Sequence, residues 1–204
     1  MFNDKYGLTQ AVLEGKKTQT RRIVTCPKTY NGITVSGYRI LTNSLGQQLT
    51  YLVDEDECEI EGSCLMPTYH IGEEIAIAQK YVDVLDYNFI HLDKPSILND
   101  VILNDASYKA GKENKMFVKA NLMPHRIKTT NIRIERLQDI SEEDCLKEGV
   151  KRKNERYVVE NQKGVVFYTN DPILAFRCLI DKTCGKGTWD SNPYVFVYNF
   201  KLIK

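Results

Sequence analysis

The sequence has no long hydrophobic run, and its longest uninterrupted apolar stretch is the five residues Tyr194–Tyr198. Because a membrane-spanning helix needs roughly 18 apolar residues, no membrane role is indicated. The start, Met-Phe-Asn-Asp-Lys, has neither the basic stretch nor the apolar run of a secretory signal, and none of the six cysteines belongs to a Cys-x-x-Cys motif. We therefore expect a cytoplasmic protein with reduced thiols.

Neither sign of charge is in excess, since 28 lysines and arginines stand against 27 aspartates and glutamates. A protein that holds nucleic acid by bulk charge alone is therefore disfavoured, although the balance does not exclude a local basic patch. Residues 54–61 hold six acids and no base, which is typical of a solvated acidic loop. Cys58, Cys64 and His70 lack the spacing of common zinc motifs, so we expect no metal and no cofactor.

The chain of 204 residues has an ordinary globular composition, with 42% apolar and 27% charged residues. It contains no repeat, low-complexity tract or linker, so we expect one domain over residues 1–204 with a small β insertion at about 26–70. Apolar periodicity predicts a short helix from Leu8, and capping signals predict helices after Ser141 and after Asp171. Strand-like runs lie at 17–24, 33–41, 48–53, 74–78, 115–120, 126–137, 165–169 and 194–203. Many strands and few helices favour an α+β barrel or a rolled sheet.

The densest polar cluster is Gly15–Arg22, which follows the first predicted helix and holds four cations and two hydroxyls. A lysine beside a threonine hydroxyl can act as a base when burial or neighbouring cations lower its pKa. Lys16, Arg21 and Arg22 would crowd Lys17 in this way. The same composition also suits a solvated strand edge, so the cluster alone leaves both interpretations open.

Three separated segments carry a family resemblance: Gly15–Arg22 after a short helix, Leu137–Glu143 with Glu148, and Gly185–Val197. In these segments the chain resembles the ASCH domains of the PUA-like superfamily, and its closing segment is similar to the longer ASCH proteins of phages and mobile elements. The resemblance implies a PUA-like mixed β-barrel with peripheral helices and a β insertion. It also implies a cleft suited to RNA or to a nucleoside.

One branch of the family, similar to the N4-acetylcytidine amidohydrolases, removes an acyl group from the exocyclic nitrogen of cytidine with a lysine, a threonine and a glutamate. By motif position these would be Lys17, Thr20 and Glu148, and Arg22 matches the family's arginine after the threonine. Thr20 would attack the acyl carbon, Lys17 would take its proton, and Glu148 would help protonate the leaving amine. Residues 17 and 20 of a regular strand face opposite ways, so Lys17 has to lie at the corner before the strand or on a bulge.

Three functions fit these residues. The leading one is binding of RNA or a modified nucleoside in a basic cleft, and the second is the amidohydrolase, which requires the lysine, threonine and glutamate to meet at one cleft. The third is an interaction protein of a mobile element that uses the acidic segment 54–61. Where the longer ASCH proteins carry Arg-Glu, this chain has Ala78-Gln79. The substrate-binding candidates are Arg21, Arg22, Gln79, Arg133 and Arg136.

Overall fold

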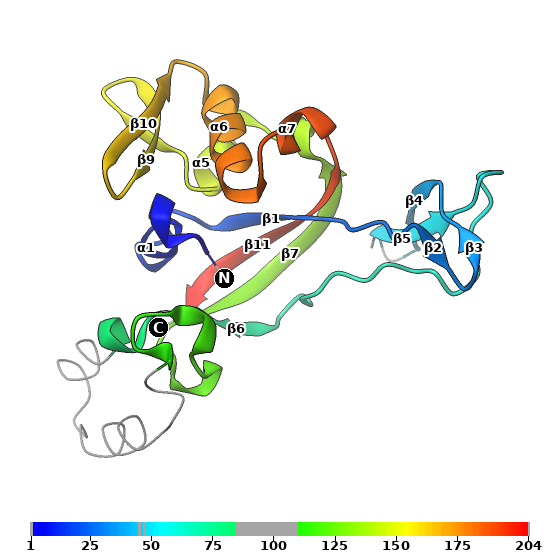
Figure 1. The fold of residues 1–204 in the computed structure, drawn as a ribbon, viewed down its shortest axis with the longest axis horizontal. Coiled ribbons are helices and arrows are strands. Elements are labelled where there is room, and N and C mark those ends of the chain that lie inside the picture. Colours follow the sequence, from blue (N-terminus) through cyan, green and yellow to red (C-terminus); the bar gives the residue numbers. More distant parts are fainter. Residues whose placement is uncertain (1, 45, 47, 85–109, 204) are drawn as a thin grey trace.

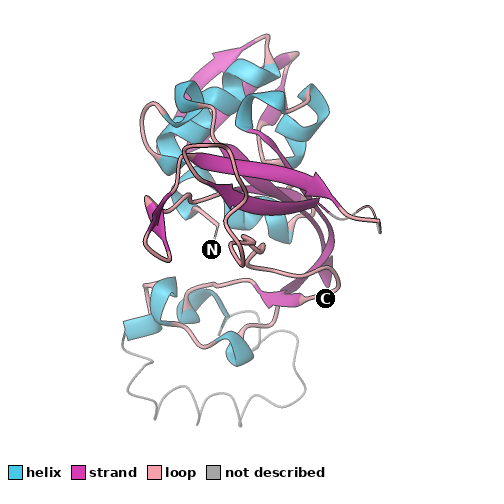
Figure 2. Ribbon diagram, turned by 90° about the vertical axis from the view of Figure 1, so that its right-hand side faces the viewer, coloured by secondary structure: helices cyan, strands magenta, loops and turns pink. Residues whose placement is uncertain are grey.

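The fold is α+β, as the sequence predicts, and is built on a curled antiparallel half-barrel (Figures 1 and 2). The computed structural model describes residues 2–44, 46, 48–84 and 110–203. Four strands form the main sheet in the order β1–β11–β7–β6, so β1 and β6 are its edges in the described part of the chain. These strands are β1 (Gln19–Ile23), β6 (Glu74–Ala76), β7 (Arg126–Arg136) and β11 (Tyr194–Ile203).

Strands β7 and β11 form the centre of the sheet and are rich in β-branched and aromatic residues, which favour extended backbone. Because side chains alternate along a strand, Val195 and Val197 pack into one core cluster, whereas Phe196 and Tyr198 pack into another on the opposite face. A register shift between Asn199 and Phe200 marks a bulge, and such irregularities increase local twist.

A helical layer covers the Val195 face of the sheet (Figure 1). Helix α5 (Glu142–Lys147) begins after Ser141, whose side chain accepts a hydrogen bond from the backbone N–H of Asp144. Helix α6 (Pro172–Cys184) begins after Asp171, which caps it in the same manner. Both predicted helix starts are confirmed, because side-chain capping is a local interaction between residues two or three apart. The layer also contains the three-stranded sheet β8 (Lys151–Lys153), β9 (Arg156–Asn161) and β10 (Gly164–Thr169), and helix α7 (Thr188–Ser191).

The β insertion expected at about 26–70 forms two hairpins that project from one end of the sheet (Figure 1). Its tyrosine Tyr38 packs edge-on against Tyr194, and Gln48 accepts a hydrogen bond from the backbone of Ile134. The acidic segment is not wholly solvated, since Ile60 is buried within it and Glu59 pairs with Arg39. The hairpin strands are β2 (Thr29–Tyr30), β3 (Ile33–Thr34), β4 (Gly37–Thr42) and β5 (Gln48–Val53).

One local prediction is wrong, and one hairpin was not predicted. The run 115–120 was expected to be a strand, but it forms the short 3-10 turns η2 (Lys115–Phe117) and η3 (Ala120–Leu122), the first of which is capped by the Asn114 side chain. The β8–β9 hairpin was missed because its residues are mostly polar. Two further 3-10 turns, η1 (Asp4–Tyr6) and η4 (Leu137–Asp139), flank the helices. In the described ranges, every helix is too short or too polar to cross a bilayer.

Candidate active site

The corner between α1 (Leu8–Leu13) and β1 places Lys17 before the strand begins. Gly15 adopts a positive φ of 70°, and the backbone N–H groups of Lys16 and Lys17 both donate to the carbonyl of Ala11, which closes the turn. Strand β1 starts only at Gln19. Lys17 therefore lies at the corner before the strand. The alternation of side chains between the two faces of a strand does not apply to it, so Lys17 and Thr20 need not point away from each other.

Lys17 and Glu148 form a buried ion pair beneath this corner. The Lys17 Nζ lies 2.7 Å from Oε2 of Glu148 and 2.6 Å from its backbone carbonyl oxygen, and the side chains are only 2% and 6% exposed. Glu148 occupies the position that ends α5, and Gly149 follows with a φ of 105°. A β-carbon at Gly149 would lie 2.8 Å from Leu8 and 3.6 Å from the Lys17 stem, so the backbone reversal holds both elements close together.

Arg21 binds the other oxygen of Glu148 and ties the site to the sheet. Its Nη1 lies 3.0 Å from Oε1 of Glu148 and 2.7 Å from Oε1 of Gln19, and its Nη2 pairs with Glu135 and, at 3.4 Å, with Asp144. The Arg21 side chain is 1% exposed. Its carboxylate partners outweigh the effect of burial and raise its pKa above the ordinary value, so Arg21 is a fixed positive charge in the network.

Burial lowers the pKa of Lys17 below its ordinary value of 10.5. Glu148 opposes this effect, whereas the charges of Arg22 and Arg21 add to it. Lys16 takes no part in the crowding expected for it, because its side chain is 71% exposed and pairs with Glu14 at the surface. Lys17, the buried one of these two neighbouring lysines, is therefore the candidate base.

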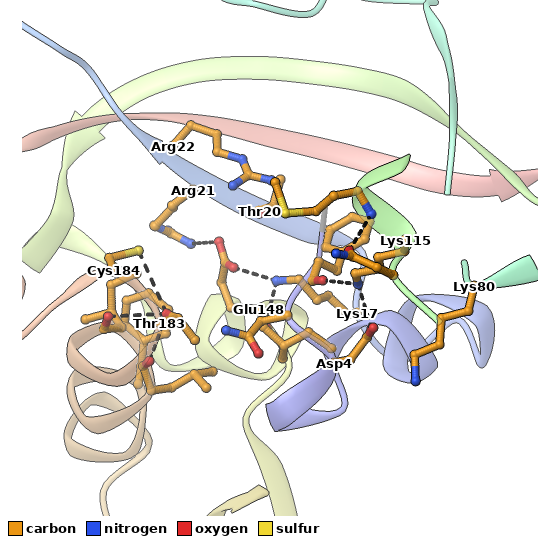
Figure 3. Close-up of a pocket in the computed structure, with 18 of the residues that line it drawn as sticks. Asp4, Lys17, Thr20, Arg21, Arg22, Lys80, Lys115, Glu148, Thr183 and Cys184 are labelled. Atoms are coloured by element: carbon orange, nitrogen blue, oxygen red, sulfur yellow. Dashed lines mark hydrogen bonds and ion pairs between the residues drawn. The ribbon is translucent and has the colours of Figure 1, made fainter. Parts of the chain in front are cut away.

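A cavity of about 480 Å³ opens above this ion pair (Figure 3). Strand β1 is an edge strand, so side chains from both of its faces reach the cavity. Thr20 and Arg22 approach from the face opposite to Arg21, and the Thr20 hydroxyl makes no hydrogen bond to another residue in the described part of the chain. The candidates that line the cavity are Lys17, Thr20, Arg21, Arg22 and Glu148.

The other three candidate binding residues lie outside the cavity. Gln79 is buried and lies 2.8 Å from the Nδ1 of His125, and Arg136 stacks 3.7 Å over the Tyr194 ring. Arg133 pairs with Glu135 and Asp144. Arg133 therefore shares both carboxylates with Arg21 although it does not line the cavity, and a role of these three residues in binding stays a prediction.

Sequence reasoning missed several residues at the rim of the cavity. Lys115 reaches Asp4 at 2.6 Å and Thr9 at 3.0 Å, which joins η2 to the N-terminal turn. Lys80 also lines the cavity. Nothing in the local sequence marks these contacts, since they join residues more than 100 positions apart. Within the described ranges, no three His, Cys, Asp or Glu side chains cluster as a metal site would require.

Comparison of the chain with protein-family models, with curated proteins and with solved structures finds no match. The geometry of the cavity and the chemistry of its residues therefore carry the functional inference.

Proposed function

We propose that the protein is an amidohydrolase with a PUA-like, ASCH-type fold that removes acyl groups from the exocyclic nitrogen of cytidine, as a free nucleoside or within RNA. One observation carries this proposal: the buried Lys17, held by Glu148, lines the same cavity as the Thr20 hydroxyl. A base, its positioning group and a hydroxyl nucleophile around one concave site are the parts that nucleophilic catalysis requires.

The hydrogen bonds of Lys17 suit it to the role of base. A neutral lysine amine has two N–H bonds and one lone pair, and Lys17 has two acceptors on Glu148, the backbone carbonyl and Oε2. With both N–H bonds donated, one lone pair is left to accept a proton, and in the proposed reaction this is the proton of Thr20, which lines the same cavity. The lowered pKa of Lys17 increases the fraction of the neutral form near pH 7.

The proposed reaction proceeds in two steps. Lys17 takes the proton of the Thr20 hydroxyl while the Thr20 oxygen bonds to the acyl carbon; the carbon–nitrogen bond then breaks, and the Lys17 ammonium returns the proton to the leaving amine of cytidine. Water next attacks the acyl-threonine ester with Lys17 again as base, and Thr20 recovers its proton as the carboxylic acid leaves.

Glu148 acts through Lys17 in this scheme. Both of its oxygens accept hydrogen bonds from cations, Oε2 from Lys17 and Oε1 from Arg21. A carboxylate bonded in this way is an acceptor only, so we assign proton donation to Lys17 in place of Glu148. Glu148 positions the amine and sets its basicity.

The remaining cavity suits a nucleoside. Its volume of about 480 Å³ lies within the range of roughly 300–1,000 Å³ common for small-molecule sites. Arg22 lies beside Thr20 on the lining and would stabilise negative charge on the acyl oxygen in the tetrahedral intermediate. The polar rim formed by Asp4, Asn114 and Lys115 offers both donors and acceptors to a ribose or a base.

The arrangement favours an enzyme over a groove that binds RNA through its phosphates. Such a groove needs exposed cations in a row, yet Arg21 is buried among carboxylates and Arg133 is paired with two of them. The acidic segment expected to serve an interaction protein is partly anchored by Ile60, and no observation favours that role.

The test is release of cytidine from N4-acetylcytidine, followed by chromatography, with Lys16→Met as a matched control for Lys17→Met. The wild type is expected to release cytidine and acetate. Lys17→Met is expected to lose at least about a hundredfold in kcat/KM, the usual contribution of a general base, whereas Lys16→Met stays within about twofold. No cytidine released by the folded wild type from any of a panel of N4-acylcytidines would overturn the proposal, as would equal losses in the two variants.

A further inference from the structure

A second cavity, of about 210 Å³, adjoins the first beside strands β1, β6, β7 and β11. Phe2, Thr20 and Arg22 line both cavities, so the two spaces meet at the proposed nucleophile. If the acyl carbon of a substrate lies at Thr20, the cytidine can occupy one of the two cavities and the rest of the acyl group can occupy the other.

The two spaces differ in chemistry. The first is lined by charged and polar groups, among them Asp4, Lys80 and Lys115. The second is lined mainly by aliphatic and aromatic side chains, and Arg22 is its one charged residue among the described ones. Its apolar lining includes Ile75, Ala76, Ile77, Ala78, Ile127 and Phe200. A polar nucleoside therefore suits the first space and an apolar group suits the second.

We propose that the second cavity is the acyl subsite and that the enzyme prefers N4-acylcytidines whose acyl group is a medium-length alkyl chain or an aromatic ring over the acetyl compound. This inference rests on the proposed amidohydrolase function. Apolar cavities of about 150 Å³ are large enough to hold a benzene ring, so 210 Å³ holds a phenyl ring or a chain of several carbons. An acetyl methyl group leaves most of this space unfilled.

Ala78 sets the size of the subsite. It lines the cavity just beyond the end of β6, and its single methyl group leaves room that a larger residue would take up. Tyr69 and Tyr198, which also line the cavity, stack edge-to-face with their ring centroids 5.6 Å apart, and the Tyr198 hydroxyl accepts a hydrogen bond from the Thr68 backbone. These contacts hold the two tyrosine rings in place, so a larger side chain at position 78 would reduce the volume of the subsite.

The expected preference follows from apolar burial. Each buried methylene contributes about fourfold to kcat/KM, since burial of one CH₂ is worth about 0.8 kcal/mol and a tenfold change corresponds to about 1.36 kcal/mol. Four added methylenes that fill only part of the space still predict at least about a tenfold advantage of the N4-hexanoyl substrate over the N4-acetyl substrate.

The experiment measures kcat/KM of the wild type, Ala78→Leu and the control Ala120→Leu with N4-acetyl-, N4-hexanoyl- and N4-benzoylcytidine. Ala120 is exposed and lies outside both cavities. The wild type and Ala120→Leu are expected to prefer the two larger substrates. Ala78→Leu is expected to lose at least about tenfold more kcat/KM with these two substrates than with the acetyl substrate, and circular dichroism of the variant and of the wild type shows whether the variant folds. Ala78→Val replaces it if the leucine variant is insoluble.

The outcomes separate the two proposals. Efficient hydrolysis of the acetyl substrate without a preference for the larger ones overturns the acyl subsite and leaves the amidohydrolase intact. Equal losses with all three substrates in Ala78→Leu also overturn the subsite. No hydrolysis of any of the three by the wild type overturns the amidohydrolase and the subsite together.

Discussion

The Lys17–Glu148 ion pair predicts a specific response to Glu148→Gln. Removing one member of a buried pair leaves an uncompensated charge and commonly costs about 3–5 kcal/mol of unfolding free energy. Arg21 loses one carboxylate partner but keeps Glu135 and Asp144, whereas Lys17 loses the one carboxylate with which it pairs in the described part of the chain. The glutamine retains an oxygen that accepts one hydrogen bond. We therefore expect Glu148→Gln to lower the unfolding free energy by about 3 kcal/mol at pH 7, near the lower end of this range.

The loss should shrink as the pH rises. Burial already lowers the pKa of Lys17 in the folded protein, and Glu148 is the group that opposes this, so the variant has a still lower Lys17 pKa. Below the ordinary value of 10.5 and above its folded pKa, the unfolded chain binds more protons than the folded one, so stability rises with pH. The gap between variant and wild type narrows by up to about 1.4 kcal/mol per pH unit between their two folded pKa values.

The assay is urea unfolding followed by the fluorescence of Trp189, the single tryptophan, which is buried against Phe176. Measurements run from about pH 6 to about pH 9. Glu143→Gln is the matched control, because Glu143 is 78% exposed and should change stability by less than about 0.5 kcal/mol at every pH. A Glu148→Gln variant whose unfolding free energy lies within about 0.5 kcal/mol of the wild type at pH 7, or a difference that does not narrow with pH, would show that Glu148 does not stabilise a charged Lys17.

Two further predictions concern the same corner of the fold. The rate of the wild type should rise with pH as Lys17 loses its proton, at a pH below its ordinary pKa of 10.5. Glu148→Gln should move this rise to lower pH, because Glu148 raises the Lys17 pKa. A rise at the same pH in both proteins would contradict the assignment of Lys17 as the base. Gly149→Ala should lower the unfolding free energy by about 1–3 kcal/mol in urea titrations, because the new β-carbon would lie 2.8 Å from Leu8 and the residue would have to keep a φ of 105°. An unchanged urea midpoint would show that the backbone at Gly149 is not closely packed against Leu8.

The parts of the fold that the sequence predicts are those determined by local interactions. The starts of α5 and α6 follow from Ser141 and Asp171, whose side chains cap helices through neighbours two or three residues away. Strand β11 follows from a continuous run of β-branched and aromatic residues. The turns η2 and η3 were missed because the capping side chain of Asn114 and tertiary contacts outweigh the strand propensity of 115–120.

The same distinction applies to the candidate site. The motif spacing pointed to Lys17, Thr20 and Glu148, and the structure brings these residues to one cavity, while their catalytic roles stay a prediction. The sequence could not show that Arg133 is neutralised, because this depends on the strand register that places it between Glu135 and Asp144. Charged side chains that a sequence suggests for ligand binding are often found in ion pairs once strands and helices are assembled.

The role of Thr20 as nucleophile can be tested by comparing Thr20→Ser with Thr20→Val in the release of cytidine from N4-acylcytidine. Serine keeps the hydroxyl that attacks the acyl carbon, whereas valine keeps the branched shape of threonine and removes the hydroxyl. We expect Thr20→Ser to retain kcat/KM within about tenfold and Thr20→Val to lose at least about a thousandfold, with both variants folded like the wild type. A Thr20→Val variant as active as the wild type would contradict the mechanism.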